Sequence, residues 1–188
     1  MAEPSTGFAE AIGALRGAGV TCVVVGAYGI NLYATAPSQI LLTEDCDLPL
    51  PADPTVLGAA FEVLRAVGFA LSLGGEPFLG AGLEDLRTLV RHRSTVRAVR
   101  GRTQLDLMLA VAGLEHADAW ARGREFVVRG QSIRAAPLAD LLESKRLVGR
   151  PKDRAFLESW KFAVESARDD EARRIARELG ERDSGDAR

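Results

Sequence analysis

Carboxylates inside two otherwise apolar, strand-like runs most strongly constrain how this chain can fold. Asp45 and Asp47 lie in the first run and Asp106 lies in the second. Because side chains alternate between the faces of a strand, Asp45 and Asp47 are expected on one face and Cys46 on the other. Grouped carboxylates repel one another, and a hard cation such as Mg²⁺ is the usual remedy. The pattern predicts a metal site, although a D-x-D can also be a solvated strand end.

A glycine turn precedes the first acidic run. The apolar stretch Val23-Val24-Val25 ends at Gly26 and leads directly into a helical pattern at Ala27. Such a turn offers free backbone N–H groups and the positive end of a helix dipole, and both favour phosphate binding. The turn and the carboxylate pair together predict a site for phosphates and metal.

Composition limits the class of protein. With 188 residues and 47% hydrophobic content, the chain can bury one core and carry a helical extension. A formal net charge of −2 argues against general coating of nucleic acid but permits a local basic patch. Cys22 and Cys46 are predicted to be buried thiols, and two cysteines with two histidines build no zinc motif. Without a leader-like start or a membrane-length apolar run, a cytoplasmic protein with no membrane contact is expected.

Hydrophobic periodicity divides the chain into helices and strands. Helices are predicted over about 7–18, 27–34, 55–67 and 112–122. Strands are predicted over about 20–25, 42–49, 69–73, 87–92, 95–99 and 103–109, with a hairpin over 126–134. The glycine-rich segment 74–82 is expected to be a mobile surface loop.

The pattern becomes wholly helical from Pro137 onward. A helix opens there, Gly149-Arg150-Pro151 breaks it, and further helices are predicted to about 167 and over 169–180. The prediction is an α/β (α+β) fold, with a mixed sheet flanked by helices in a core domain at 1–136. A helical segment at 137–180 is expected to pack on this core, and 181–188 is expected to be a disordered tail.

This order of elements resembles the nucleotidyltransferase fold, in which a glycine turn, a D-x-D strand and a third acid follow one another. The resemblance spans about residues 20–160. Within that superfamily, the segments Leu138-Ala139-Asp140-Leu141-Leu142-Glu143-Ser144-Lys145-Arg146 and Gly149-Arg150-Pro151-Lys152-Asp153 resemble the AbiEii-type group of toxin-antitoxin and phage-defence nucleotidyltransferases.

The resemblance implies a role for each matched residue. It assigns metal binding and catalysis to Asp45, Asp47 and Asp106, and nucleotide binding to Gly26, Ala27, Lys145, Lys152 and Asp153. The implied reaction uses two Mg²⁺ ions and moves a nucleoside monophosphate from a nucleoside triphosphate such as ATP to a hydroxyl of tRNA, other RNA or another macromolecule, releasing pyrophosphate. A cognate toxin or antitoxin protein is the implied partner.

Two departures from the family keep other functions open. Ala27 stands where the family has glycine or serine, and no basic residue occurs between Ser38 and Thr43. One alternative is a small-molecule acceptor, as in antibiotic-modifying relatives, and another is a non-catalytic, partner-binding protein. Lys145 could also be a solvated helix lysine, and Lys152 with Asp153 could serve only to cap a helix.

Arginines are concentrated before the third acid. Four of them share one parity in the predicted strands and two follow closely: Arg87, Arg91, Arg93 and Arg97, then Arg100 and Arg102. Such a basic face beside the acids would suit the phosphates of an RNA acceptor. A solvated hairpin explains the same pattern.

Overall fold

The structure is a computed structural model that describes residues 4–34, 40–80, 82–151, 153–154 and 156–157. It divides into two units, Met1–Val148 and Gly149–Arg188, and every named helix and strand belongs to the first. Most of the chain beyond Gly149, including Lys152, the predicted helix over 169–180 and the predicted tail at 181–188, lies outside the described residues. In the described part, the helices are too short or too polar to cross a membrane.

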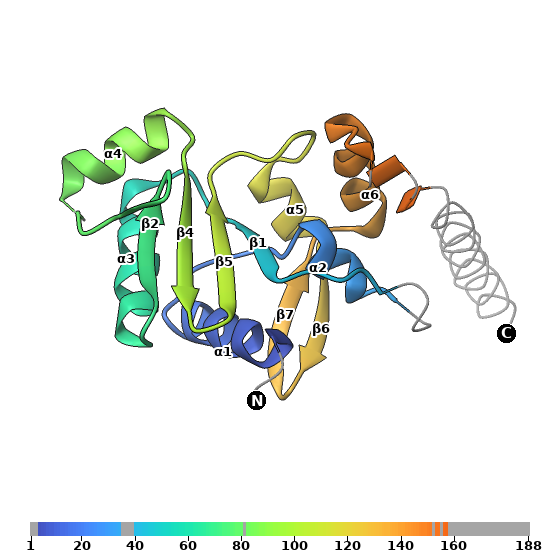
Figure 1. Ribbon diagram of the computed structural model, residues 1–188, viewed down its shortest axis with the longest axis horizontal. Helices are drawn as coiled ribbons and strands as arrows, with labels where there is room; N and C mark the ends of the chain where they lie inside the picture. Colours follow the sequence, from blue (N-terminus) through green and yellow to red (C-terminus); the bar gives the residue numbers. More distant parts are fainter. Residues whose placement is uncertain (1–3, 35–39, 81, 152, 155, 158–188) are drawn as a thin grey trace, which may run out of the picture. The chain divides into compact units, whose positions relative to one another are not determined.

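A mixed, five-stranded sheet forms the centre of the first unit (Figure 1). Its strands, in spatial order, are β1 (Asp45–Pro49), β5 (Thr103–Met108), β4 (Thr95–Arg100), β2 (Ala70–Leu73) and β3 (Glu76–Pro77). The β1 and β5 strands are parallel, and each of the other neighbouring pairs is antiparallel. A separate hairpin joins β6 (Arg124–Val128) to β7 (Gln131–Ala135).

An extended segment before Gly26 connects the sheet to the hairpin. The Val24 N–H donates to the Arg134 carbonyl at 2.8 Å, and the Val25 N–H donates to the Asp47 carbonyl at 3.0 Å. Adjacent residues therefore bond to different strands, β7 and β1. The predicted strand over 20–25 is present only as this extended segment with isolated bridges, because neither neighbour pairs with it continuously.

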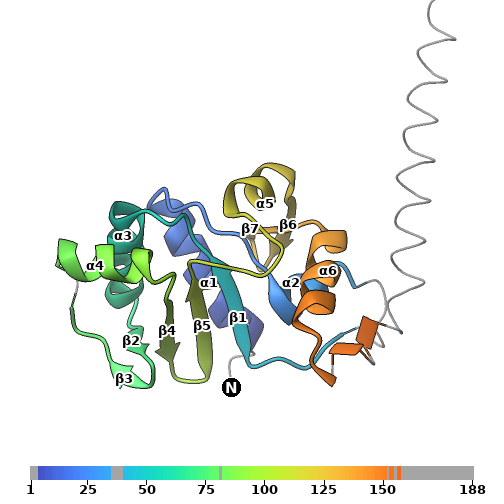
Figure 2. The same cartoon turned by 90° about the horizontal axis from the view of Figure 1, so that it is seen from above.

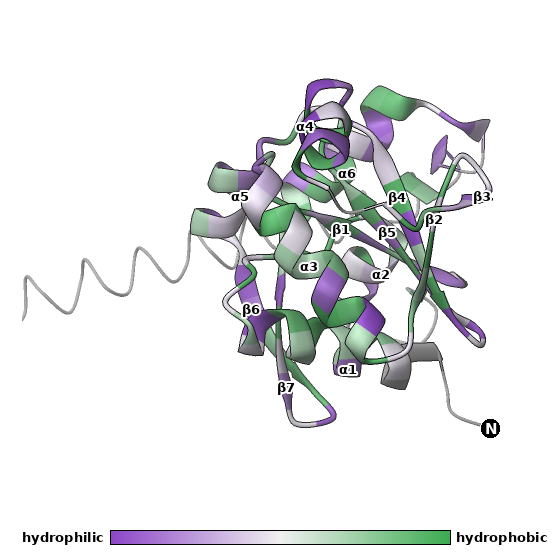
Figure 3. Ribbon diagram, turned by 90° about the vertical axis from the view of Figure 1, so that its left-hand side faces the viewer, coloured by the Kyte–Doolittle hydropathy of each residue, from purple (hydrophilic) through white to green (hydrophobic). Residues whose placement is uncertain are grey.

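Two helices, α1 (Pro4–Gly17) and α3 (Pro54–Ala66), cover one face of the five-stranded sheet (Figure 2). Figure 3 shows hydrophobic residues along the central strands that these helices face. The buried residues of this layer include Phe8, Ile12, Leu15, Leu57, Phe61 and Leu64 from the helices and Leu48, Val96, Leu105 and Leu107 from the strands. The helix predicted over 7–18 is confirmed as α1, and its apolar residues Phe8, Ile12 and Leu15 are buried.

Four further helices complete the first unit: α2 (Gly26–Asn31), α4 (Leu83–Arg91), α5 (His116–Arg122) and α6 (Leu138–Val148). Gly29 of α2 would place a Cβ 3.4 Å from Leu141, so α2 and α6 pack closely. The helix predicted from Pro137 is confirmed, and its break at Gly149 agrees with the end of α6. The boundary predicted at 137 stays a prediction.

The strand predicted over 87–92 is wrong, because this segment belongs to α4. Leu86 and Leu89 are buried three residues apart, which is a helical spacing, and Glu84 and Asp85 occupy the first turn where acids favour the helix dipole. Part of the glycine-rich segment also differs from the predicted loop, since it forms the short β3 strand beside β2.

A residue of α2 fixes the backbone of the segment that leads into β1. The Asn31 side chain donates to the Leu41 carbonyl at 2.8 Å and accepts from the Leu41 N–H at 2.7 Å. These two hydrogen bonds satisfy the backbone N–H and C=O of Leu41, as pairing with a neighbouring strand would. The first regular residue of β1 is therefore Asp45, whereas the sequence pattern placed the start of the strand near 42.

Candidate active site

The predicted carboxylates lie on the sheet face opposite α1 and α3, which we call the open face. Strand pairing sets Asp47 beside Asp106, and Asp106 beside Arg97, in one row across β1, β5 and β4. Asp45 shares the face of Asp47 and lies beside Gln104 in the next row. In these two rows the side chains are half-buried or exposed, whereas Cys46, Leu105 and Val96, which project to the other face, are buried. The sheet thus brings Asp45, Asp47 and Asp106 to one surface, as predicted.

An arginine from the neighbouring strand binds the third acid. The Arg97 Nε and Nη2 donate to the two oxygens of Asp106 at 2.8 and 3.1 Å. These hydrogen bonds and the Asp106 charge raise the pKa of Arg97, and the charges of Asp45 and Asp47 raise it further. The guanidinium is therefore within electrostatic range of all three carboxylates.

Buried thiols lie beneath this row. Burial raises the pKa of Cys22 to about 12 and that of Cys46 well above its ordinary range, and the charges of Asp47, Asp45 and Asp106 add to the effect at Cys46. Both cysteines are buried and free, as predicted. Cys46 projects to the covered face of β1, away from Asp45 and Asp47, and burial disfavours the thiolate form of both cysteines.

The glycine turn lies directly against the carboxylate pair. Gly26 has a φ of +64°, and a Cβ at this position would collide with Oδ2 of Asp47. Only glycine combines this backbone conformation with so close an approach. The turn predicted to receive phosphates is thus adjacent to one of the predicted metal ligands, and half-buried Ala27 follows it in α2.

A hydroxyl orients the other member of the pair. Oγ1 of Thr43 donates to Oδ1 of Asp45 at 2.6 Å, and it lies 3.1 Å from the Asp45 carbonyl oxygen. The contact joins the turn before β1 to the first residue of the strand. Thr43 therefore holds the Asp45 side chain in a defined position at the edge of the open face.

The donor chemistry of this row fits a hard divalent cation, since carboxylate oxygens are the ligands that Mg²⁺ uses in proteins. In the described part of the chain, however, no three metal-binding side chains are gathered closely enough to hold an ion. Both oxygens of Asp106 accept from Arg97 instead. Asp45 and Asp47 lie on the same face as this arginine–carboxylate pair.

The C-terminal residues predicted to contact nucleotide are only partly placed. Lys145 is half-buried on α6, one turn after Leu141, whose side chain faces α2. Lys145 therefore lies on the side of α6 that is directed toward α2. Lys152 lies outside the described residues, and Asp153 belongs to the second unit, where it is buried. The roles of all three residues stay predictions.

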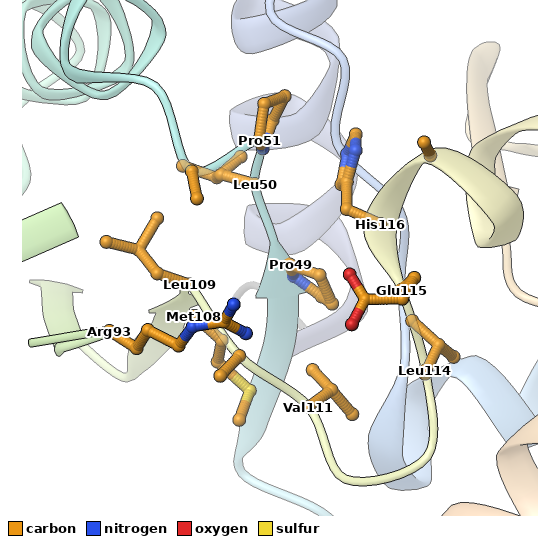
Figure 4. Close-up of a pocket in the computed structure, with 13 residues that line it drawn as sticks. Pro49, Leu50, Pro51, Arg93, Met108, Leu109, Val111, Leu114, Glu115 and His116 are labelled. Atoms are coloured by element: carbon orange, nitrogen blue, oxygen red, sulfur yellow. The ribbon is translucent and has the colours of Figure 1, made fainter. Parts of the chain in front are cut away.

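A cleft of about 270 Å³ lies at the C-terminal ends of β1 and β5, and none of the three acids is among its lining residues. Pro49 and Met108 form part of its wall, and each lies two residues beyond Asp47 or Asp106 on the same strand face. Figure 4 shows the Arg93 guanidinium and the Glu115 carboxylate on different sides of this cleft, both directed toward its interior. The remaining walls are mainly apolar, from residues such as Leu109, Val111 and Leu114.

The continuous basic face predicted for the arginines is wrong. Arg87 and Arg91 lie on α4, and Arg93 follows that helix with a φ of +48°. Arg97 pairs with Asp106, and Arg100 pairs with Glu10 at 2.7 Å. The strand parity that suggested a common face does not apply, because only the last part of this segment is a strand.

Sequence reasoning missed the Arg97–Asp106 pair, although a signal was present. Gly101-Arg102 is a two-residue turn between β4 and β5, and Arg100 pairs with Thr103 across it. Counting back equally from such a turn sets Arg97 opposite Asp106. The Thr43 contact had no comparable signal, because it depends on the irregular backbone before β1.

Comparison with known proteins gives one informative likeness, and it concerns structure. No protein-family model matches the sequence, and no curated protein is similar to it in sequence. A solution structure of the antibiotic-resistance factor ANT(2'')-Ia, an aminoglycoside nucleotidyltransferase, matches with a TM-score of 0.52 and 15% identity, covering 96% of this chain and 95% of that one. A crystal structure of ANT(2'')-Ia in complex with adenylyl-2''-tobramycin matches with a TM-score of 0.43 and 14% identity, covering 85% and 98% of the two chains. The mixed sheet flanked by helices therefore has the nucleotidyltransferase fold.

Proposed function

We propose that this protein transfers a nucleoside monophosphate from a nucleoside triphosphate to a hydroxyl group of a small molecule and releases pyrophosphate. The observation that carries the proposal is the row of Asp47 and Asp106 across parallel strands, with Asp45 on the same open face and Gly26 against Asp47. The nucleotidyltransferase fold supports it.

In this reaction the acceptor oxygen forms a bond to the α-phosphorus, the bond to pyrophosphate breaks, and the acceptor hydroxyl gives its proton to solvent water. Asp45 and Asp47 would hold Mg²⁺, with Asp106 as the further ligand, and the bound ions would neutralise phosphate charge and favour in-line displacement. Gly26 would let the triphosphate approach the backbone, and Lys145 would attract its negative charge. Thr43 would keep Asp45 oriented throughout.

Three observations favour a small acceptor over the RNA or other macromolecule that the family resemblance implies. The cleft near the row has a volume of about 270 Å³, just below the range of roughly 300–1,000 Å³ for small-molecule sites, so it suits only a small ligand. The basic strand face that would have held RNA phosphates is absent from the described residues, since Arg87 and Arg91 belong to α4. The structural neighbour ANT(2'')-Ia is an antibiotic-resistance factor, which agrees with a small acceptor.

The AbiEii-type assignment, with its cognate toxin or antitoxin, continues to rest on the sequence motifs around Lys145 and Lys152. A non-catalytic role is the remaining alternative, and Ala27 in the turn is its main support. Nucleotide transfer distinguishes these possibilities, because a purely partner-binding protein would form no nucleotidylated product.

The test is a transfer assay with each of the four α-labelled ribonucleoside triphosphates, Mg²⁺ and either total RNA or a panel of hydroxylated amino sugars. The proposal expects a labelled small-molecule product, abolished by Asp45→Asn and retained by the control Asp118→Asn, which alters an exposed carboxylate on α5. Labelling of RNA alone would refute the small-acceptor assignment. No product in either arm would refute the enzymatic function.

A further inference from the structure

Arg97 and Asp106 form an ion pair within the row of carboxylates. The guanidinium presents two parallel N–H groups to the two carboxylate oxygens, at 2.8 and 3.1 Å, in the bidentate geometry typical of strong arginine pairs. The Asp106 side chain is 13% exposed, whereas that of Arg97 is 50% exposed. The Asp106 carboxylate is therefore largely shielded from solvent, while the Arg97 side chain is in contact with it.

The surroundings of the pair allow the arginine to leave. On β2, the strand on the other side of β4 from Asp106, the residue paired with Arg97 is Ser72. Strand pairing therefore places no second acid beside the guanidinium there. The open face bears no core side chains at this row, because the apolar residues of β4, Val96 and Ala98, project to the opposite face. Rotation of the Arg97 side chain toward solvent would leave the core packed.

The same pair withholds a ligand from a cation. A carboxylate offers about four lone-pair sites, and the bidentate arginine occupies one on each oxygen, so a hard ion at Asp106 must displace the guanidinium or bind beside its positive charge. Arg97 also lies within electrostatic range of Asp45 and Asp47, so its single positive charge partly neutralises all three acids. A divalent cation entering the row would be repelled by the guanidinium. It would also have to bind the Asp106 oxygens that the guanidinium already contacts.

We propose that Arg97 is a built-in competitor of the divalent cation for Asp106, and that cation binding releases its guanidinium to an anionic phosphate group of the nucleotide. This inference rests on the proposed function, because it deepens the account of the same site. It makes Arg97 a positioning residue: it keeps Asp106 from coordinating a cation in the absence of nucleotide. Metal and nucleotide should then bind with positive coupling. The cation frees Arg97 to contact a phosphate, and the phosphate draws Arg97 away from the Asp106 oxygens that the cation needs.

The first test measures Mn²⁺ affinity without nucleotide, by electron paramagnetic resonance of free Mn²⁺, for the wild type and for Arg97→Gln. Removing the competitor should raise Mn²⁺ affinity by about tenfold, the value of one charge-assisted hydrogen-bonded pair. The matched control is Arg87→Gln, which removes an arginine that pairs with Glu84 on the exposed surface of α4. It should leave Mn²⁺ affinity unchanged.

Unchanged or weaker Mn²⁺ binding by Arg97→Gln would overturn the proposal, as would failure of both wild type and variant to bind the ion. A second measurement needs no mutation. In the full-length wild type, the Arg97 Nε–H resonance should shift during Mg²⁺ titration and saturate with metal binding. A resonance that stays in place while Mg²⁺ binds elsewhere on the protein would equally overturn it.

The outcomes separate this inference from the proposed function. Nucleotide transfer that depends on Asp45, combined with unchanged Mn²⁺ affinity in Arg97→Gln, would remove the competition and leave the function standing. Higher Mn²⁺ affinity in Arg97→Gln, with no transfer of any nucleotide, would leave the competition standing and remove the function. Weaker triphosphate binding by Arg97→Gln in saturating Mg²⁺ is the further result expected if the released guanidinium contacts phosphate.

Discussion

Single residues define the geometry of the acidic site, and Gly26 is the most constrained of them. Its φ of +64° lies in the left-handed region that side chains rarely adopt, and Asp47 occupies the space where a Cβ would project. The colliding atom is the end of a side chain, so Asp47 can rotate away. A substitution at Gly26 should therefore damage the carboxylate arrangement more than the fold.

We predict that Gly26→Ala lowers the free energy of unfolding by about 1–3 kcal/mol through backbone strain and abolishes nucleotide transfer. Urea unfolding and the transfer assay measure the two effects. The control Gly17→Ala changes a glycine at the end of α1 with open space around it and should affect neither. Full activity in Gly26→Ala would show that the close approach to Asp47 has no functional role.

Thr43 offers a second test at the scale of a residue. Replacing its hydroxyl with a methyl group in Thr43→Val removes the 2.6 Å hydrogen bond to Asp45 with little change in shape. We expect kcat/KM to fall by about tenfold, since hydrogen bonds to charged groups contribute on the order of 1.5–3 kcal/mol. Thr43→Ser keeps the donor and should retain most of the activity. Equal loss in both variants would contradict an orienting role.

How much of the site the sequence could predict depends on the kind of relation between residues. Strand alternation is local, so it correctly set Asp45 and Asp47 on one face. The turn at Gly101 sets the strand register that places Arg97 opposite Asp106, but the run of arginines suggested a common basic face instead. The distance between Thr43 and Asp45 follows from irregular backbone, for which the sequence offers no periodic signal.

At the scale of elements, periodicity predicted the helices at 55–67 and from 137, because long apolar stripes leave little ambiguity. It failed at 87–92, where alternating arginines resembled a strand although Leu86 and Leu89 followed a helical spacing. The short extended segment before Gly26 also exceeded what periodicity can resolve, since Val24 and Val25 bond to different strands.

A hydrogen bond connects the start of α5 to the extended segment before Gly26, and this hydrogen bond is sensitive to pH. His116 lies 3.0 Å from the Thr21 carbonyl through Nε2, and burial lowers its pKa below the ordinary value of about 6.5. The folded protein therefore favours neutral His116, whose Nε2–H donates to Thr21. This contribution to stability is complete above pH about 6.5 and is lost as pH falls below that value toward the lower folded pKa.

We predict that the free energy of unfolding of the wild type decreases between pH about 6.5 and 5, and that His116→Gln removes part of this decrease. Urea unfolding over this pH range provides the measurement. His92→Gln, which alters an exposed histidine after α4, should keep the wild-type dependence. A parallel pH profile for wild type and His116→Gln would exclude His116 as its source.

At the scale of the whole molecule, one sheet serves two purposes. Its covered face binds α1 and α3 and forms the core, while its open face carries the charged row of Asp47, Asp106 and Arg97. The strand order explains why acids 59 positions apart in the chain, Asp47 and Asp106, become neighbours. The candidate site thus lies on the sheet itself, with the cleft near the ends of β1 and β5.

Calorimetric titration with a non-hydrolysable ATP analogue tests the central claim most directly, because it asks whether the open face binds a nucleotide through its carboxylates. For the wild type we predict binding that requires Mg²⁺, and for Asp47→Asn a loss of affinity of about tenfold or more. Binding of equal strength in wild type and Asp47→Asn, or binding that is unchanged by removal of Mg²⁺, would contradict the account.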